Sequence, residues 1–210
     1  PQKRITLDGY WIYKYPVTLT NYLAFCAATG RSHEPSWCQT FHAEMDGDDG
    51  TYPATVNWFE AAAYAAWAGA ALPSEAQWEK AARGTDEREY PWGNAWDPAK
   101  AVGLERTTYQ FQSGLMPVGS SPAGASPYGV EDMAGNCWEW VADWYAHDYY
   151  RKSPGRNPAG PQAGTHKVLR GGYALADERY SRTAARMVHP PQVSDWTPVG
   201  FRCVIPAVRP

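Results

Sequence analysis

The protein has 210 residues, a net charge of −3, and 19 glycines and 18 prolines. This length suits a single domain, and so many turn-forming residues exclude a bundle of long helices. The 19 basic and 22 acidic side chains form no basic stripe, and no run of eighteen apolar residues occurs, so the sequence predicts neither a nucleic-acid partner nor a membrane span.

The first fifteen residues alternate apolar and polar side chains, which predicts an early strand or a hairpin that turns at Asp8-Gly9. They contain no apolar signal segment, so a cytoplasmic location is the default expectation. A helix follows, with Thr18 or Thr20 as its N-cap, apolar residues at helical spacing, and Gly30 at its end.

Two further helices carry clear start and stop signals. Residues 57–69 open with an Asn-x-x-Glu capping box, residues 74–84 open with Ser-x-x-Gln, and both segments close with a glycine. Beyond residue 84 turns recur constantly, and only 137–144, 167–170 and 200–205 have the composition of strands. Helices followed by short strands and long loops predict an α+β domain.

Five short segments occur in an order that is specific for one family. They are Leu72–Gly84 (LPSEAQWEKAARG), Tyr90–Asn94 (YPWGN), Met133–Trp140 (MAGNCWEW), Leu169–Gly172 (LRGG) and Val199–Cys203 (VGFRC). Together they resemble the formylglycine-generating-enzyme (sulfatase-modifying-factor) family, and the resemblance covers nearly the whole chain from Tyr10 onward.

The resemblance implies a single, loop-rich domain over residues 1–210 with a C-type-lectin-like fold, two to three helices and small twisted antiparallel sheets. It also implies that the C-terminal segment, at about 168–203, lies on the face used for binding. Within this fold, the alternation of apolar and charged side chains around Glu139 is typical of a strand with one face in the core. Arg202 is predicted to pair with a buried carboxylate, and Glu139 and Asp143 are the alternatives.

Some members of the family bind a structural calcium ion through the Gly-Asn-x-Trp-Glu element. Carried over to this chain, the resemblance implies side-chain oxygens from Asn136 and Glu139 and the backbone carbonyl of Cys137 as ligands. Such hard oxygen ligands suit calcium. The alternative is that Glu139 serves only as an ion-pair partner in the core.

The oxidase activity of the family depends on two cysteines that follow the Gly-Gly pair and bind copper, because Cu(I) requires soft thiolates. Here Ala176 lies near the position of the first of them, and no cysteine occurs between Cys137 and Cys203. The four cysteines, Cys26, Cys38, Cys137 and Cys203, form no CxxC pair. Three of them lie in apolar surroundings typical of buried thiols. The sequence therefore predicts no catalytic cofactor, and no formylglycine formation by the copper mechanism.

A binding surface is the remaining interpretation. The segment between Arg-Gly-Gly and Gly-Phe-Arg mixes aromatic, charged and apolar side chains without periodicity, which is typical of a recognition surface. An ordinary irregular loop with some aromatic residues in the core is the alternative. The candidate ligand-binding residues are Tyr173, Leu175, Asp177, Arg179, Tyr180, His189, Val193, Asp195 and Trp196.

Variable proteins of diversity-generating retroelements resemble the same family without its catalytic cysteines. They carry a hypervariable segment between Arg-Gly-Gly and Gly-Phe-Arg. The resemblance therefore implies a non-catalytic protein of this kind, which recognises a protein or other macromolecular ligand. Two alternatives stay open, a divergent metal-dependent oxidoreductase of the same family and an accessory domain of a larger assembly.

Overall fold

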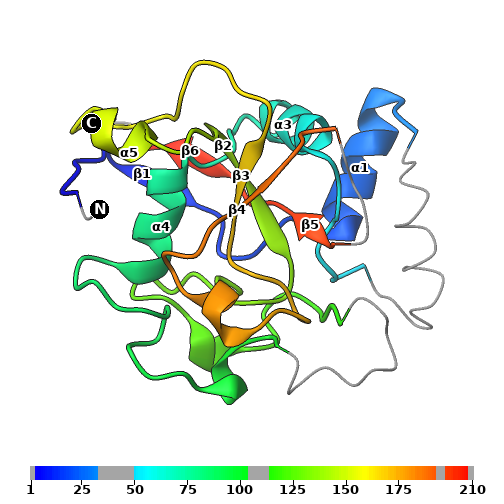
Figure 1. Ribbon diagram of the computed structural model, residues 1–210. Coiled ribbons are helices and arrows are strands. Elements are labelled where there is room, and N and C mark those ends of the chain that lie inside the picture. Colours follow the sequence, from blue (N-terminus) through cyan, green and yellow to red (C-terminus); the bar gives the residue numbers. More distant parts are fainter. Residues whose placement is uncertain (1–2, 33–49, 104–113, 193–196, 208–210) are drawn as a thin grey trace.

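The computed structural model describes residues 3–32, 50–103, 114–192 and 197–207 (Figure 1). A four-stranded sheet in the order β4-β3-β2-β5 lies at its centre. Its pairs are antiparallel, as predicted, except that β2 and β5 run parallel. The long connection through β3 and β4 allows this parallel pairing. The strands are β2 (Trp138–Trp144), β3 (Lys167–Arg170), β4 (Met187–His189) and β5 (Val199–Gly200).

Three longer helices pack around this sheet, and each begins where its capping residues predict. The side chain of Thr18 caps α1 (Leu19–Thr29), whereas α3 (Trp58–Trp67) and α4 (Glu75–Arg83) both start with complete capping boxes. None of the described helices is long and apolar enough to cross a bilayer. The shorter helical turns are η1 (Pro98–Lys100), η2 (Pro122–Gly124), α5 (Tyr149–Lys152) and η3 (Glu178–Ser181).

The N-terminal strand pairs with the C-terminal strand instead of forming the predicted hairpin. β1 (Tyr10–Ile12) and β6 (Val204–Pro206) make a separate antiparallel sheet. The residues before β1 follow a distant loop, where the Thr6 N–H donates to the carbonyl oxygen of Gly155 at 2.8 Å. Of the two alternatives, the early strand is confirmed as β1, and the hairpin at residues 8–9 does not form, because the backbone groups on both sides of it find partners that are remote in sequence.

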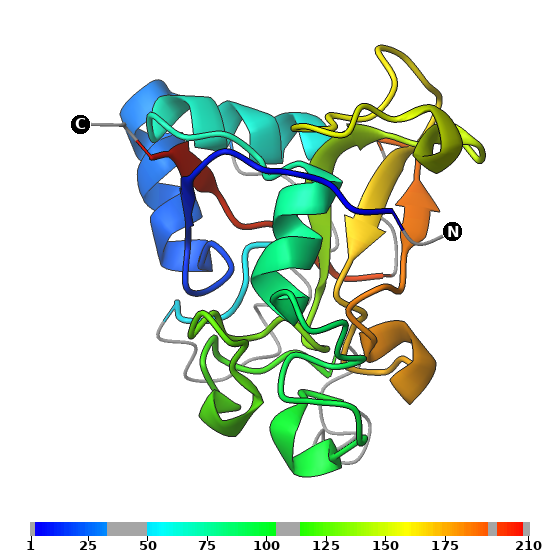
Figure 2. The same ribbon diagram turned by 90° about the vertical axis from the view of Figure 1, so that its left-hand side faces the viewer.

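Both faces of β2 are buried, although the alternation in its sequence predicted only one buried face. Trp138 and Trp140 pack with Phe201 into a core that includes residues of α1 and α3. Val141 belongs to a second apolar cluster with residues of α4, and the neighbouring Glu139 accepts a hydrogen bond from α4. Figures 1 and 2 show this arrangement, with α4 on one side of β2 and α1 and α3 on the other.

A buried ion pair crosses this core. Arg202 donates to Glu139 at 2.6 Å (Nη2–Oε1) and at 2.7 Å (Nε–Oε2), and both side chains are fully buried. The same guanidinium donates to the backbone carbonyl oxygens of Lys14 and Glu131. The predicted pairing of Arg202 with a buried carboxylate is confirmed, and of the two alternatives the partner is Glu139 rather than Asp143.

Candidate functional site

The loop between β3 and β4 carries most of the predicted ligand-binding residues, and two glycines set its course. Gly171 and Gly172 have φ angles of 98° and 78°, which lie in the region that favours glycine. A Cβ atom on Gly172 would lie 2.9 Å from the backbone oxygen of Tyr180. The loop can therefore fold back so closely on its own start only because residue 172 has no side chain.

Arg170 holds the C-terminal end of this loop in place from inside the core. Its fully buried side chain donates to the backbone oxygens of Thr183 at 2.6 Å and of Ala184 at 3.2 Å. It also pairs with two carboxylates of α4, Glu79 at 2.7 Å and Glu75 at 3.3 Å. One charged group thus ties both ends of the loop to α4 through charge-assisted hydrogen bonds.

Three predicted ligand-binding residues reach solvent from this loop. Arg179 donates to Asp177 at 2.8 Å (Nε–Oδ1), and both side chains are exposed. Tyr180 is 42% exposed, and its ring lies edge-on to Trp138 with 6.1 Å between the ring centroids. The structure therefore brings these three side chains together on one outward surface around η3.

The other predicted ligand-binding residues do not share this position. Tyr173 and Leu175 are half-buried, and Tyr173 packs against the main core. His189 lies on β4, apart from η3 in Figure 1, and its ring is edge-on to Trp140 at 6.1 Å. The remaining three lie outside the described residues: Val193, Asp195 and Trp196.

A small cleft of about 320 Å³ opens beside η3. It is lined by residues 176–179 together with Trp96, Pro98 and Gly103. The ring of Trp96 lies 5.2 Å from that of Tyr90 and 5.8 Å from that of Trp92. Trp96 was not among the predicted site residues, because it is far from the loop in sequence and its only signal was the neighbouring Tyr-Pro-Trp-Gly-Asn segment.

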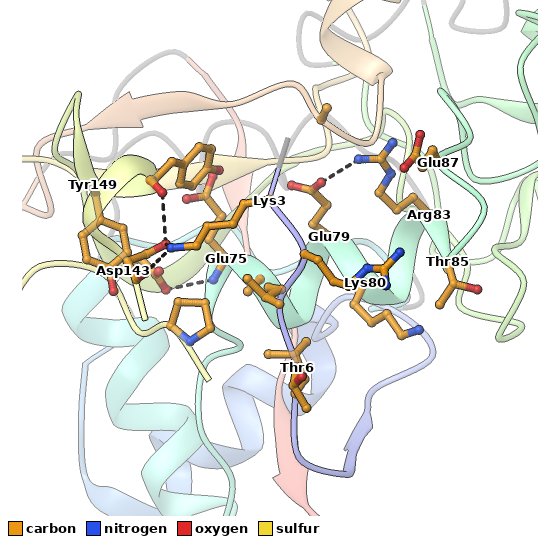
Figure 3. Close-up of a pocket in the computed structure, with 18 of the residues that line it drawn as sticks. Lys3, Thr6, Glu75, Glu79, Lys80, Arg83, Thr85, Glu87, Asp143 and Tyr149 are labelled. Atoms are coloured by element: carbon orange, nitrogen blue, oxygen red, sulfur yellow. Dashed lines mark hydrogen bonds and ion pairs between the residues drawn. The ribbon is translucent and has the colours of Figure 1, made fainter. Parts of the chain in front are cut away.

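A larger cleft, of about 1110 Å³, runs along α4 between the N-terminal residues 3–7 and α5 (Figure 3). None of the predicted ligand-binding residues lines it. Several of its charged groups are already bound to protein: Glu79 pairs with Arg83 at 2.9 Å, and Lys3 donates to Ser153. This cleft is therefore separate from the surface around η3.

Asp143 lines the larger cleft and makes stability depend on pH. Burial raises its pKa to about 7, although the Glu75 N–H donates to the carboxylate at 2.8 Å. The folded state then keeps a proton that the unfolded state loses near pH 4, so the contribution of Asp143 to stability falls as the pH rises from 4 to 7. We expect Asp143→Asn, which keeps an acceptor for this N–H, to flatten that dependence and to exceed the parent in stability above pH 7. Urea unfolding between pH 4 and 8 measures both effects, and an unchanged slope would contradict the assignment.

Sequence similarity to known proteins identifies the family of this chain. The family model "Sulfatase-modifying factor enzyme 1-like domain" matches residues 1–207. The chain belongs to the sulfatase-modifying-factor family. The formylglycine-generating enzyme of Thermomonospora curvata is 33% identical to it over 260 residues, which cover 97% of this chain and 84% of the enzyme.

Solved structures that superpose on this chain confirm the predicted C-type-lectin-like fold of the formylglycine-generating-enzyme type. PvdO from Pseudomonas aeruginosa superposes with a TM-score of 0.74 at 26% identity, covering 93% of this chain and 79% of PvdO. Treponema denticola variable protein 1 superposes with a TM-score of 0.71 at 20% identity, covering 96% of this chain and 86% of that protein. The second likeness shows a shared fold.

The described cysteines of this sulfatase-modifying-factor protein are not placed for copper chemistry. Ala176, near the position that the resemblance assigns to the first copper-binding cysteine, lines the small cleft. Cys26, Cys137 and Cys203 are buried and free, and burial raises the pKa of each thiol, to about 12 at Cys203. Burial thus disfavours the thiolate form that binds Cu(I). Cys38 lies outside the described residues.

The side chains that the family resemblance assigns to calcium already have protein partners. The Asn136 amide accepts from the Met116 N–H and donates to the Met116 carbonyl oxygen, both at 3.1 Å. Both oxygens of Glu139 accept from Arg202, and Oε2 also accepts from the indole N–H of Trp78 at 2.7 Å. Within the described ranges no three His, Cys, Asp or Glu residues group as metal ligands. In the structure these side chains are engaged with protein groups, and the calcium site stays a prediction.

Proposed function

We propose that this sulfatase-modifying-factor protein is a non-catalytic ligand-binding protein whose recognition surface is the loop between β3 and β4. The proposal rests on the surroundings of Ala176, which stands near the place where the family's oxidase needs a thiolate. Directly beside it the side chains of Asp177, Arg179 and Tyr180 face solvent. Aromatic residues and arginine are the side chains that most often carry affinity at interfaces.

The attachment of the loop supports recognition of a macromolecule. Arg170 and Gly172 hold the loop in place in the folded protein. A loop that is ordered before binding loses less conformational entropy when the ligand arrives. The same separation between fixed framework and exposed side chains fits a segment that a diversity-generating retroelement varies, because the exposed residues can change without loss of the fold. The shared fold with Treponema denticola variable protein 1 supports this reading.

Incubation with a cysteine-containing peptide, copper and oxygen tests whether the chain is catalytic. We expect no conversion of the peptide cysteine to formylglycine, because no cysteine is among the described residues that line the small cleft. A thiol reductant in the mixture reverses the disulfide formation that copper and oxygen cause by themselves. The Thermomonospora curvata enzyme, assayed in the same way, serves as the positive control. Conversion of the peptide cysteine to formylglycine would instead support a metal-dependent oxidoreductase, the alternative that the 33% identity to that enzyme favours.

Sequencing of the coding region and its flanks in independent isolates tests the diversified segment. We expect substitutions to concentrate in the codons of the loop residues and to spare those of Arg170, Gly171 and Gly172. A neighbouring reverse transcriptase and a template repeat that differs at adenines should accompany them. Substitutions spread evenly along the gene would contradict the retroelement hypothesis, while leaving the binding function to be tested separately.

A further inference from the structure

We propose that the small cleft beside η3 is a subsite for one cationic side chain, lysine or arginine, of the macromolecular ligand. This inference rests on the proposed function, because it assigns a chemistry to the same surface. The cleft volume of about 320 Å³ is near the lower limit of small-molecule sites, so it suits a single side chain.

The ring of Trp96 supplies the aromatic wall of this subsite. It is half-buried, lines the cleft, and packs against Tyr90 and Trp92. Those two rings are stacked, with 5.4 Å between their centroids and 9° between their planes. The cluster therefore holds Trp96 in one orientation. A cation within about 6 Å of the face of a tryptophan ring is attracted by the negative charge density of that face.

Two acidic residues line the cleft, Glu178 at the start of η3 and Asp177 at its N-cap. The carboxylate of Asp177 is neutralised by Arg179, which also lines the cleft. In the described part of the chain no cationic side chain pairs with Glu178, so its charge is available to a ligand. A guanidinium or ammonium group in the cleft would lie between the Trp96 ring and this carboxylate.

The environment of Tyr90 gives independent support for a negative potential here. Burial is the main cause that raises the pKa of its hydroxyl, and the carboxylates of Glu178, Glu89 and Asp177 raise it further. The nearby guanidinium of Arg182 acts in the opposite direction. Arg179 pairs with Asp177, so three acidic groups stand against two basic ones, Arg179 and Arg182, around the aromatic cluster. The remaining negative charge favours a positively charged occupant of the cleft.

The indole N–H signal of Trp96 in a ¹H–¹⁵N correlation spectrum provides the test, and its absence in Trp96→Phe assigns it. The probe is the tripeptide acetyl-Gly-Arg-Gly-amide, and acetyl-Gly-Glu-Gly-amide is the matched control. We expect a saturable shift with the arginine peptide alone. Glu178→Gln should weaken the binding by about two- to fivefold. Asp148→Asn removes the same charge from an exposed site elsewhere and should leave the affinity unchanged.

Three results would overturn the subsite: no shift with the arginine peptide, an equal shift with the glutamate peptide, or equal affinities for Glu178→Gln and Asp148→Asn. These failures are distinct from a failure of the proposed function. If the peptide-oxidation assay stays negative and the Trp96 signal does not move, only the cationic subsite is wrong. If formylglycine forms, the non-catalytic function is wrong whatever the Trp96 signal shows.

Discussion

Replacement of Arg202 by methionine is expected to lower the free energy of unfolding by about 3–5 kcal/mol, because it leaves a buried charge without its partner. Among the described residues, Glu139 would keep only the indole N–H of Trp78 as a donor. The carbonyl oxygens of Lys14 and Glu131 would lose a charged donor as well. Chemical denaturation followed by tryptophan fluorescence measures the loss.

Two further variants make this expectation specific to the buried pair. Arg179→Met removes a guanidinium from an exposed pair, so we expect no measurable change in melting temperature. Combining Arg202→Met with Glu139→Leu removes both charges and should recover part of the loss. An Arg202→Met protein within about 1 kcal/mol of the parent would show that Glu139 does not depend on this partner.

Arg170→Met is expected to cost about 2–3 kcal/mol and to free the loop between β3 and β4. The global loss is smaller than at Arg202, because Glu75 keeps its pair with Arg186 and Glu79 keeps its pair with Arg83. The local stability of the loop falls more than the global stability, since the backbone oxygen of Thr183 loses its buried donor. Amide hydrogen exchange across residues 171–184 should therefore accelerate more than exchange in α3.

Arg170→Lys separates the charge from the geometry at this position. A lysine keeps the positive charge, but its single ammonium group cannot reproduce the planar fork that reaches two carboxylates and two backbone oxygens. We expect intermediate stability with loop exchange close to that of Arg170→Met. If exchange in the loop stays at the parental rate in both variants, the loop is held by other contacts and Arg170 is only a core residue.

The two arginines explain why the Arg-Gly-Gly and Gly-Phe-Arg motifs flank the candidate surface. Both guanidinium groups are fully buried. Arg170 joins β3 to two carboxylates of α4, and Arg202, just after β5, pairs with Glu139 on the neighbouring strand β2. Between them Asp177 and Arg179 bond to each other, while Tyr180 also packs against Trp138 of β2. The exposed Asp177–Arg179 pair thus makes no contact with the two buried arginines, as a binding loop on a fixed scaffold requires.

Sequence alone determined the elements that depend on neighbours along the chain. The N-caps of α1, α3 and α4 were predicted correctly because a capping side chain bonds to a backbone N–H only three residues away. The lack of a cysteine after the Gly-Gly pair is likewise a property of the sequence itself. The family followed from the order of short motifs, and the matched model confirms it.

Only the tertiary structure decided which remote segments meet. It pairs β1 with β6 in place of a local hairpin, selects Glu139 as the partner of Arg202, and brings Trp96 and Ala176 into the lining of one cleft. The period of a strand reveals which side chains share a face, but it does not specify the partner strand. Such partners are chosen by the burial of apolar area and by the need of every buried polar group for a hydrogen bond, and both depend on the whole fold at once.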